Sequence, residues 1–200
     1  TTEITNISGF PQSATLTVTA GSLLVVEFCY LNSPGDAVVT DNNGGTWTKD
    51  KTISSGNVPN ARVSVFSCPN AAAGSTDITV TPTGSGTWRA KIREFSGVQT
   101  SAGYVDQSSS NSDDTTSAPT ATPSPGLTIP AGALVITTWM FDRSPTPSGP
   151  TGWTGAAFAS GDAYSAYKIF AGSGSGERGA ITSSATHYDA AMVVFKAAGG

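Results

Sequence analysis

One hydrophobic run occurs twice in this chain, and the repetition limits the folds that the chain can adopt. Residues 20–30 read AGSLLVVEFCY, and residues 131–141 read AGALVITTWMF. Further runs match in the same order: GGTWT (44–48) with TGWT (151–154), ARVSVF (61–66) with SAYKIF (165–170), and WRAKIREFSG (88–97) with YDAAMVVFKA (188–197). The matching runs are strand-like and the length differences fall in loops, as expected when the core holds strand register and loops drift. We therefore predict an internal duplication, with pseudo-repeats at about 10–98 and 118–198.

The residue pattern indicates an all-β protein. Runs of β-branched residues alternate with turns such as DNNGG (41–45), whose Asn, Asp and Gly residues tolerate positive φ. LLVVEFCY (23–30) is hydrophobic almost throughout, as in a strand that is buried on both faces. Packing the two halves together would protect strand edges that each half leaves open. We therefore predict one domain, residues 1–200, folded as a two-sheet antiparallel β-sandwich with a jelly-roll-like topology, rather than two separate domains.

The two halves need a connection, and the Ser-, Asp-, Thr- and Pro-rich segment at about 106–126 fits that role. Asp106, Asp113 and Asp114 in this segment could hold Ca²⁺ together with backbone carbonyls. A low-complexity connection is the simpler interpretation of these residues, and the clustered His or Cys ligands of a zinc site are absent from the sequence. We therefore predict neither a metal site nor a cofactor.

The two cysteines of the chain, Cys29 and Cys68, both lie in the first half. Their counterparts in the second half are Met140 and Gly172, so the second repeat lacks both members of the pair. Because both cysteines occur in the first half and both are missing from the second, we predict that they form a disulfide. A disulfide would place the protein in an oxidising, extracytoplasmic compartment. The alternative is two buried free thiols that act as small hydrophobic residues.

Aromatic residues suggest a surface for sugars, whose flat C–H faces stack on aromatic rings. Trp47 and Trp153 occupy matching places in the two halves, which favours core packing over an exposed platform. Tyr104 and Tyr164 have no clear match in the other half and are better surface candidates. We retain all four as candidate ligand-binding residues.

Three cations lie on one side of a predicted strand, because alternation in WRAKIREF places Arg89, Lys91 and Arg93 together. The matching residues of the second half are Asp189, Ala191 and Val193, so this stripe belongs to the first half alone. It could meet acidic glycans, carboxylates or an acidic partner. The alternative is a solvated outer face of the sheet, paired with Glu27 or Glu94.

Catalysis has little support in the sequence. His187 is the only histidine and shares a strand face with Asp189, but no G-x-S-x-G nucleophile elbow accompanies them. A net charge of −4 disfavours nucleic acid as a partner. No apolar run reaches the length of a membrane span. We therefore predict a non-enzymatic protein that neither binds nucleic acid nor spans a membrane.

The phrases AGSLLVVEF, VTDNNGGTWTK, VSVFSCPNAAAGSTDITVT and REFSGV resemble β-sandwich modules of large secreted bacterial proteins and phage structural proteins. The resemblance covers roughly residues 14–198 and implies surface display, adhesion or glycan binding, without assigning any residue a role. The leading hypothesis is a secreted or virion-surface module that binds a polysaccharide or surface glycan. The alternative is a self-associating virion decoration, fibre or filament subunit, in which residues 1–12 could serve as a strand donated to a neighbour's sheet edge.

Overall fold

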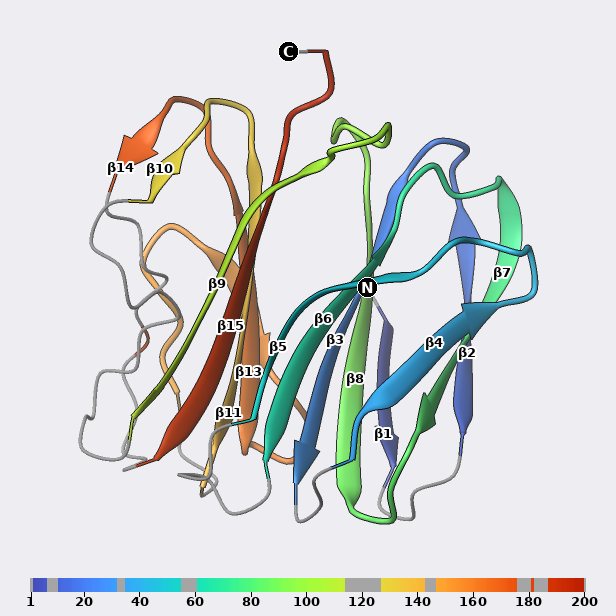
Figure 1. Cartoon of the computed structure of the whole chain (residues 1–200), viewed down its shortest axis with the longest axis vertical. Coiled ribbons are helices and arrows are strands. Elements are labelled where there is room, and N and C mark those ends of the chain that lie inside the picture. The colour runs from blue at the N-terminus through green and yellow to red at the C-terminus, as the bar shows by residue number, and fades with distance from the viewer. Residues whose placement is uncertain are drawn as a thin grey trace.

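The computed structural model describes residues 2–6, 11–31, 35–54, 61–113, 127–142, 147–175, 181 and 187–199. These residues form strands and loops and no helix, and the strands pair in antiparallel sheets (Figure 1). The all-β prediction is confirmed. The described part of the chain contains no helix that could cross a membrane.

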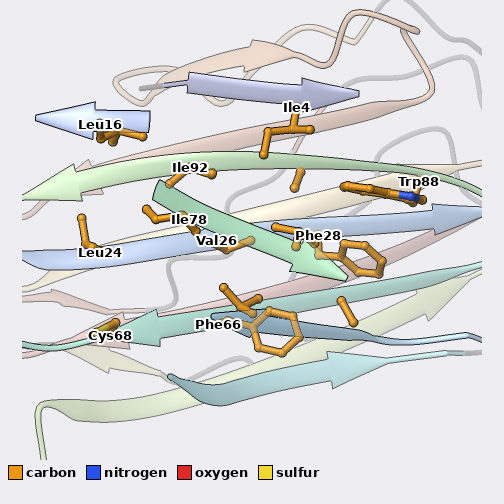
Figure 2. Close-up of a cluster of buried hydrophobic side chains, with 14 of the residues drawn as sticks. Ile4, Leu16, Leu24, Val26, Phe28, Phe66, Cys68, Ile78, Trp88 and Ile92 are labelled. Carbon is orange, nitrogen blue, oxygen red and sulfur yellow. The ribbon is translucent and has the colours of Figure 1, made fainter. Parts of the chain in front are cut away.

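The first half forms two sheets. The larger has the order β1-β8-β3-β6-β5, with bounds β1 Thr2–Asn6, β3 Leu23–Leu31, β5 Thr48–Ile53, β6 Arg62–Cys68 and β8 Thr87–Phe95. The smaller has the order β2-β7-β4, with bounds β2 Gln12–Val18, β4 Ala37–Asp41 and β7 Gly74–Pro82. The core between them is built from side chains of both sheets, including Phe28, Ile78 and Trp88 (Figure 2).

The second half is built around another five-stranded sheet, with the order β12-β13-β11-β15-β9. Its strands are β9 Val105–Asp113, β11 Leu134–Phe141, β12 Thr154–Ala157, β13 Ala163–Ile169 and β15 Tyr188–Phe195. A short pair, β10 Thr128–Ile129 and β14 Gly174–Ser175, lies beyond it (Figure 1). The described residues thus form four sheets, so the prediction of two sheets is wrong.

The two five-stranded sheets pack face to face in the middle of the molecule (Figure 1). Alternation along β3 explains how: Leu23, Val25 and Cys29 enter this central layer, whereas Leu24 and Val26 enter the core under the three-stranded sheet. A strand that faces a core on each side needs hydrophobic residues at nearly every position. The predicted burial of residues 23–30 on both faces is confirmed, since all of them are at most 1% exposed.

The central strands β3 and β11 carry the two matching runs of the sequence. The ladders refine one of the sequence matches. Val65 lies opposite Glu27, and Ser165 lies opposite Thr138, which matches Glu27 in the repeat. Val65 and Ser165 therefore hold equivalent ladder positions, whereas the sequence match sets Val65 against Ile169.

The N-terminal residues pair within their own chain. β1 forms an antiparallel ladder with β8, from Thr2 opposite Ile92 to Asn6 opposite Trp88. The described part of the predicted donor strand is therefore already the edge of the first five-stranded sheet. The predicted connection at 106–126 also begins as a strand, because β9 pairs with β15 up to Asp113, while residues 114–126 lie outside the described part.

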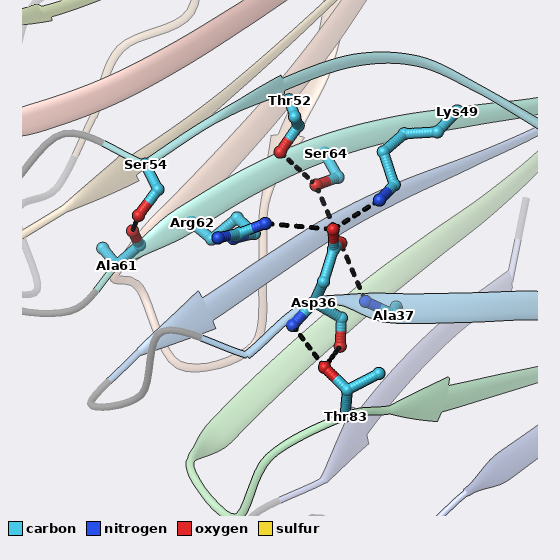
Figure 3. A network of polar contacts seen from close by, with 9 residues as sticks. All are labelled: Asp36, Ala37, Lys49, Thr52, Ser54, Ala61, Arg62, Ser64 and Thr83. Atoms are coloured by element: carbon cyan, nitrogen blue, oxygen red, sulfur yellow. Dashed lines mark hydrogen bonds and ion pairs between the residues drawn. The ribbon is translucent and has the colours of Figure 1, made fainter.

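A polar network around Asp36, the residue before β4, joins β5, β6 and the residue that follows β7 (Figure 3). The Asp36 carboxylate pairs with the Lys49 ammonium and with Arg62 Nη1 at 3.0 Å, and accepts a hydrogen bond from Ala37 N at 2.8 Å. Its backbone N–H donates to Thr83 Oγ1 at 2.8 Å. Burial alone would raise the pKa of Asp36, but these hydrogen bonds and the charges of Lys49 and Arg62 outweigh it and lower the pKa.

We expect Asp36→Asn to destabilise the protein by about 1 kcal/mol at pH 7, because the pairs are partly solvated. A lowered folded-state pKa means that the ionised carboxylate contributes its stability above the ordinary carboxyl pKa and loses it as pH falls through the folded value. The difference between wild type and variant should therefore shrink below about pH 4. Urea unfolding at pH 7 and pH 3 measures this, and an unchanged difference at pH 3 would contradict it.

Candidate ligand-binding pocket

The structure places a pocket at one end of the first half, where loops leave β4 and β6 and where β7 begins. Its cavity has a volume of about 350 Å³, in the range of small-molecule sites. Polar side chains come from Asp41, Asn43, Thr46, Asn70, Thr76 and Thr100. We call this cavity the Asp41 pocket.

The apolar part of the Asp41 pocket comes from Leu24, Cys68 and Ala71, which also belong to the core under the three-stranded sheet. Gly45 lies against this apolar part of the pocket. A Cβ on Gly45 would approach Asp41 Oδ2 to 2.3 Å and Cys68 Sγ to 2.6 Å. Glycine at this position therefore keeps the backbone close to both side chains.

The Asp41 side chain organises the loop that forms the rim. It accepts hydrogen bonds from Asn43 N at 2.8 Å, Gly45 N at 3.0 Å and Trp47 Nε1 at 2.7 Å. Burial would raise the pKa of Asp41, but these donors outweigh it and lower the pKa. With the Gly44 backbone N–H, four donors in all hold this carboxylate, so its role is to fix the rim of the pocket.

Two asparagines of the same loop are also held in place. Asn43 Nδ2 donates to Thr76 Oγ1 at 2.8 Å, and Asn42 Oδ1 accepts from Asp77 N at 2.9 Å. The loop is therefore fixed by its own hydrogen bonds before any ligand arrives. Such preorganisation lowers the entropic cost of binding.

A second, more open cavity of about 350 Å³ lies beside the first, and we call it the Tyr104 cleft. It is lined by Thr48, Asp50, Gly103, Tyr104 and Val105, with Lys49. The Tyr104 ring is half-buried and stacks on Phe195 with centroids 6.2 Å apart and planes 4° apart. Its hydroxyl is 2.9 Å from Ser67 Oγ.

Asp50 is a residue that the sequence analysis did not identify. The ladder between β5 and β6 shifts between Lys49 and Lys51, so Asp50 is the additional residue of a β-bulge. Bulges redirect side chains and often occur beside functional sites. Burial raises the pKa of Asp50 to about 6, with a partly offsetting hydrogen bond from Ser67, and its Oδ2 has no hydrogen-bond donor among the described residues.

The structure does not bring the predicted ligand-binding aromatics together. Trp47 and Trp153 are half-buried and pack against the two outer cores, Trp47 beside the Asp41 loop and Trp153 edge-on to Phe170. Tyr164 is 8% exposed and belongs to a core, so its predicted exposure at the surface is wrong. Tyr104 alone of the four lines one of the two cavities described above.

The cationic stripe is buried between the two five-stranded sheets, so both the ligand-facing and the solvated interpretations are wrong. Arg89, Lys91 and Arg93 are 6%, 3% and 5% exposed. Arg93 Nε donates to Glu27 Oε2 at 2.8 Å, while its other end contacts Ser165 and the ring of Tyr167. These side chains hold the two sheets together.

The other two cations of the stripe also find partners in the second half. Arg89 pairs with Asp162 at 2.9 Å. Lys91 Nζ donates to the carbonyls of Ala156 and Ala157 at 3.2 and 3.3 Å and lies 4.3 Å from the centroid of the Phe158 ring. Burial of a cation is tolerated only with such partners.

Cys29 and Cys68 are both free and buried, so the predicted disulfide is wrong. Cys68 lies opposite Leu24 in the ladder, five residues along β3 from Cys29. Five strand residues span about 16 Å, far beyond the reach of a disulfide. The two thiols also face different cores, and burial raises the pKa of both.

The residues considered for metal binding and catalysis lie partly inside and partly outside the described part of the chain. No group of three or more His, Cys, Asp or Glu side chains that could hold a metal occurs in the described part. Asp114 lies outside the described residues. His187 is half-buried, and its backbone N–H lies 3.4 Å from Asp142 Oδ1.

No family model matches this chain, and neither a curated protein nor a solved structure shows significant similarity to it.

Proposed function

We propose that this protein is a non-catalytic extracellular binding module whose ligand is a neutral carbohydrate, held in the Asp41 pocket. The observation that carries the proposal is the lining of the pocket, in which a carboxylate held by its own loop, two side-chain amides and three hydroxyls surround a cavity of about 350 Å³. Sugar hydroxyls both donate and accept hydrogen bonds, and amides and hydroxyls serve both needs.

The charge of the pocket favours a neutral sugar over an acidic one. Asp41 is the single charged side chain among the described residues that line it. Arg89, Lys91 and Arg93, the cations that the sequence analysis offered for acidic glycans, are buried between the sheets. An acidic sugar would meet the Asp41 carboxylate without a compensating cation, which is electrostatically unfavourable.

We expect Thr100→Trp to abolish carbohydrate binding, because a large ring at this half-buried position would fill the Asp41 pocket. Purified wild type and variant would be applied to a glycan array and to insoluble polysaccharides, and the retained fraction compared. Ser101→Trp is the matched control, since Ser101 is exposed and does not line the pocket. Equal retention of wild type and Thr100→Trp would reject the pocket, and no binding to any glycan would reject the function.

We also infer that the two halves arose by duplication. The support is the order of the five-stranded sheets, which becomes the same when β1, β8, β3, β6 and β5 are matched in turn to β9, β15, β11, β13 and β12. The central layer fits a pseudo-twofold arrangement, since β6 contacts β15 and β8 contacts β13 across it. The jelly-roll-like description remains a prediction.

The alternative function is a self-associating virion decoration, fibre or filament subunit. Pairing of β1 within its own chain weakens the strand-donation version of this alternative. A sizing column run beside the glycan array separates the two, because a binding module should elute as a monomer.

A further inference from the structure

Two segments of the chain each contribute to the lining of both the Asp41 pocket and the Tyr104 cleft. Asp41 and residues 43–46 line the pocket and residues 48–50 line the cleft, while Thr100 belongs to the pocket and residues 103–105 belong to the cleft. Lining residues of the two cavities therefore follow one another along the chain from the end of β4 into β5, and along the loop that leads into β9. Each has a volume of about 350 Å³.

The separation of the cavities is short on the scale of a sugar chain. Thr46 lines the pocket and Thr48 lines the cleft, and two residues of extended chain span about 7 Å. A ligand with two or more linked rings could therefore reach from one cavity to the other. A single ring in the Asp41 pocket would leave the Tyr104 cleft empty.

The Tyr104 cleft offers chemistry that suits a second sugar ring. The Tyr104 ring is fixed by its stacking on Phe195 and by the contact of its hydroxyl with Ser67. A rigid tyrosine supplies contact area at low entropic cost and a polar group at its edge. Asp50, redirected by the bulge, and Thr48 add a carboxyl and a hydroxyl.

We propose that the Asp41 pocket and the Tyr104 cleft form one groove that holds a polysaccharide chain through at least two consecutive sugar units. This inference rests on the proposed carbohydrate-binding function. The groove crosses from the first half to the second, because Val105 begins β9 and Phe195 ends β15 of the second five-stranded sheet. The two halves then build the binding surface together, and neither supplies it alone.

The test is the dependence of affinity on ligand length. Isothermal titration calorimetry would use glucose and β-1,4-linked glucose chains of two to six units, together with N-acetylglucosamine chains of the same lengths. We expect affinity to rise at least tenfold between one unit and three or four units. Thr48→Trp, which fills the exposed lip of the cleft, and Tyr104→Ala should both remove this gain with length.

Trp153→Ala is the matched control, because Trp153 is a half-buried aromatic residue in the outer core of the second half, where it packs against Phe170. It should retain the full length dependence. Equal affinity for one and six units, or an equal loss in Trp153→Ala, would overturn the groove. Binding of a single unit that Thr100→Trp blocks, without any gain with length, would leave the proposed function in place. Absence of binding by wild type to both series would count against both proposals.

Discussion

Arg93→Met is expected to destabilise the protein by about 3–5 kcal/mol, the largest effect we expect from a single substitution. Glu27 is 0% exposed and receives the Arg93 guanidinium at 2.8 Å, with Thr138 Oγ1 at 3.5 Å. Removing the guanidinium leaves a carboxylate buried between two sheets without its cation. Urea or guanidinium unfolding followed by tryptophan fluorescence measures the loss.

A matched control is Arg62→Met, because Arg62 pairs with Asp36 at a site where both side chains are 21% exposed. That variant should lose no more than about 1 kcal/mol. The double variant Glu27→Met with Arg93→Met should recover most of the stability, since a buried ion pair can be replaced by hydrophobic residues of similar size. A single Arg93 variant as mild as the Arg62 variant would show that the buried pair does not hold the sheets together.

The second large effect is expected at Asp50, where Asp50→Asn should stabilise the protein by about 2 kcal/mol at pH 8. Burial raises the pKa of Asp50 to about 6, so the folded protein holds a proton that the unfolded chain has already lost above pH 4 to 5. Stability therefore falls as pH rises from about 4 to 6 and stays low above that range. The amide variant carries no such ionisation.

This difference would be measured as the free energy of unfolding of wild type and Asp50→Asn at pH 4, 6 and 8. At pH 4 the two free energies should be nearly equal. Asp77→Asn is the control, because Asp77 lies exposed on the outer face of the three-stranded sheet. It should change stability by less than about 0.5 kcal/mol at every pH. A variant at Asp50 that is less stable than wild type at pH 8 would refute the unfavourable burial of the ionised carboxyl.

Much of the fold could be predicted from local pattern. The run 23–30 indicated a strand buried on both faces, and the turn residues at 41–45 indicated where β4 ends. The number of sheets could not be predicted, because alternation shows that a strand has two faces but not which element covers each face.

The candidate site also combines features that local sequence pattern predicts with features that depend on the tertiary structure. The sequence predicts that Asp41, Asn43 and Gly45 form a turn. Only the fold shows that they surround a cavity together with Asn70 and Thr100. Asp50 could have been noticed as the residue between two lysines in an otherwise alternating strand. Its bulge and burial, however, depend on how β5 pairs with β6.

The sequence by itself determined the strands, the turns and the two matching halves, because these follow from short-range alternation and from the backbone preferences of Gly, Asn and the β-branched residues. Only the tertiary structure decided that Arg89, Lys91 and Arg93 lie inside the molecule, that Cys29 and Cys68 stay apart, and that the Asp41 pocket adjoins the Tyr104 cleft. These properties depend on which sheet face meets which, and that choice is made by packing between residues far apart in the chain.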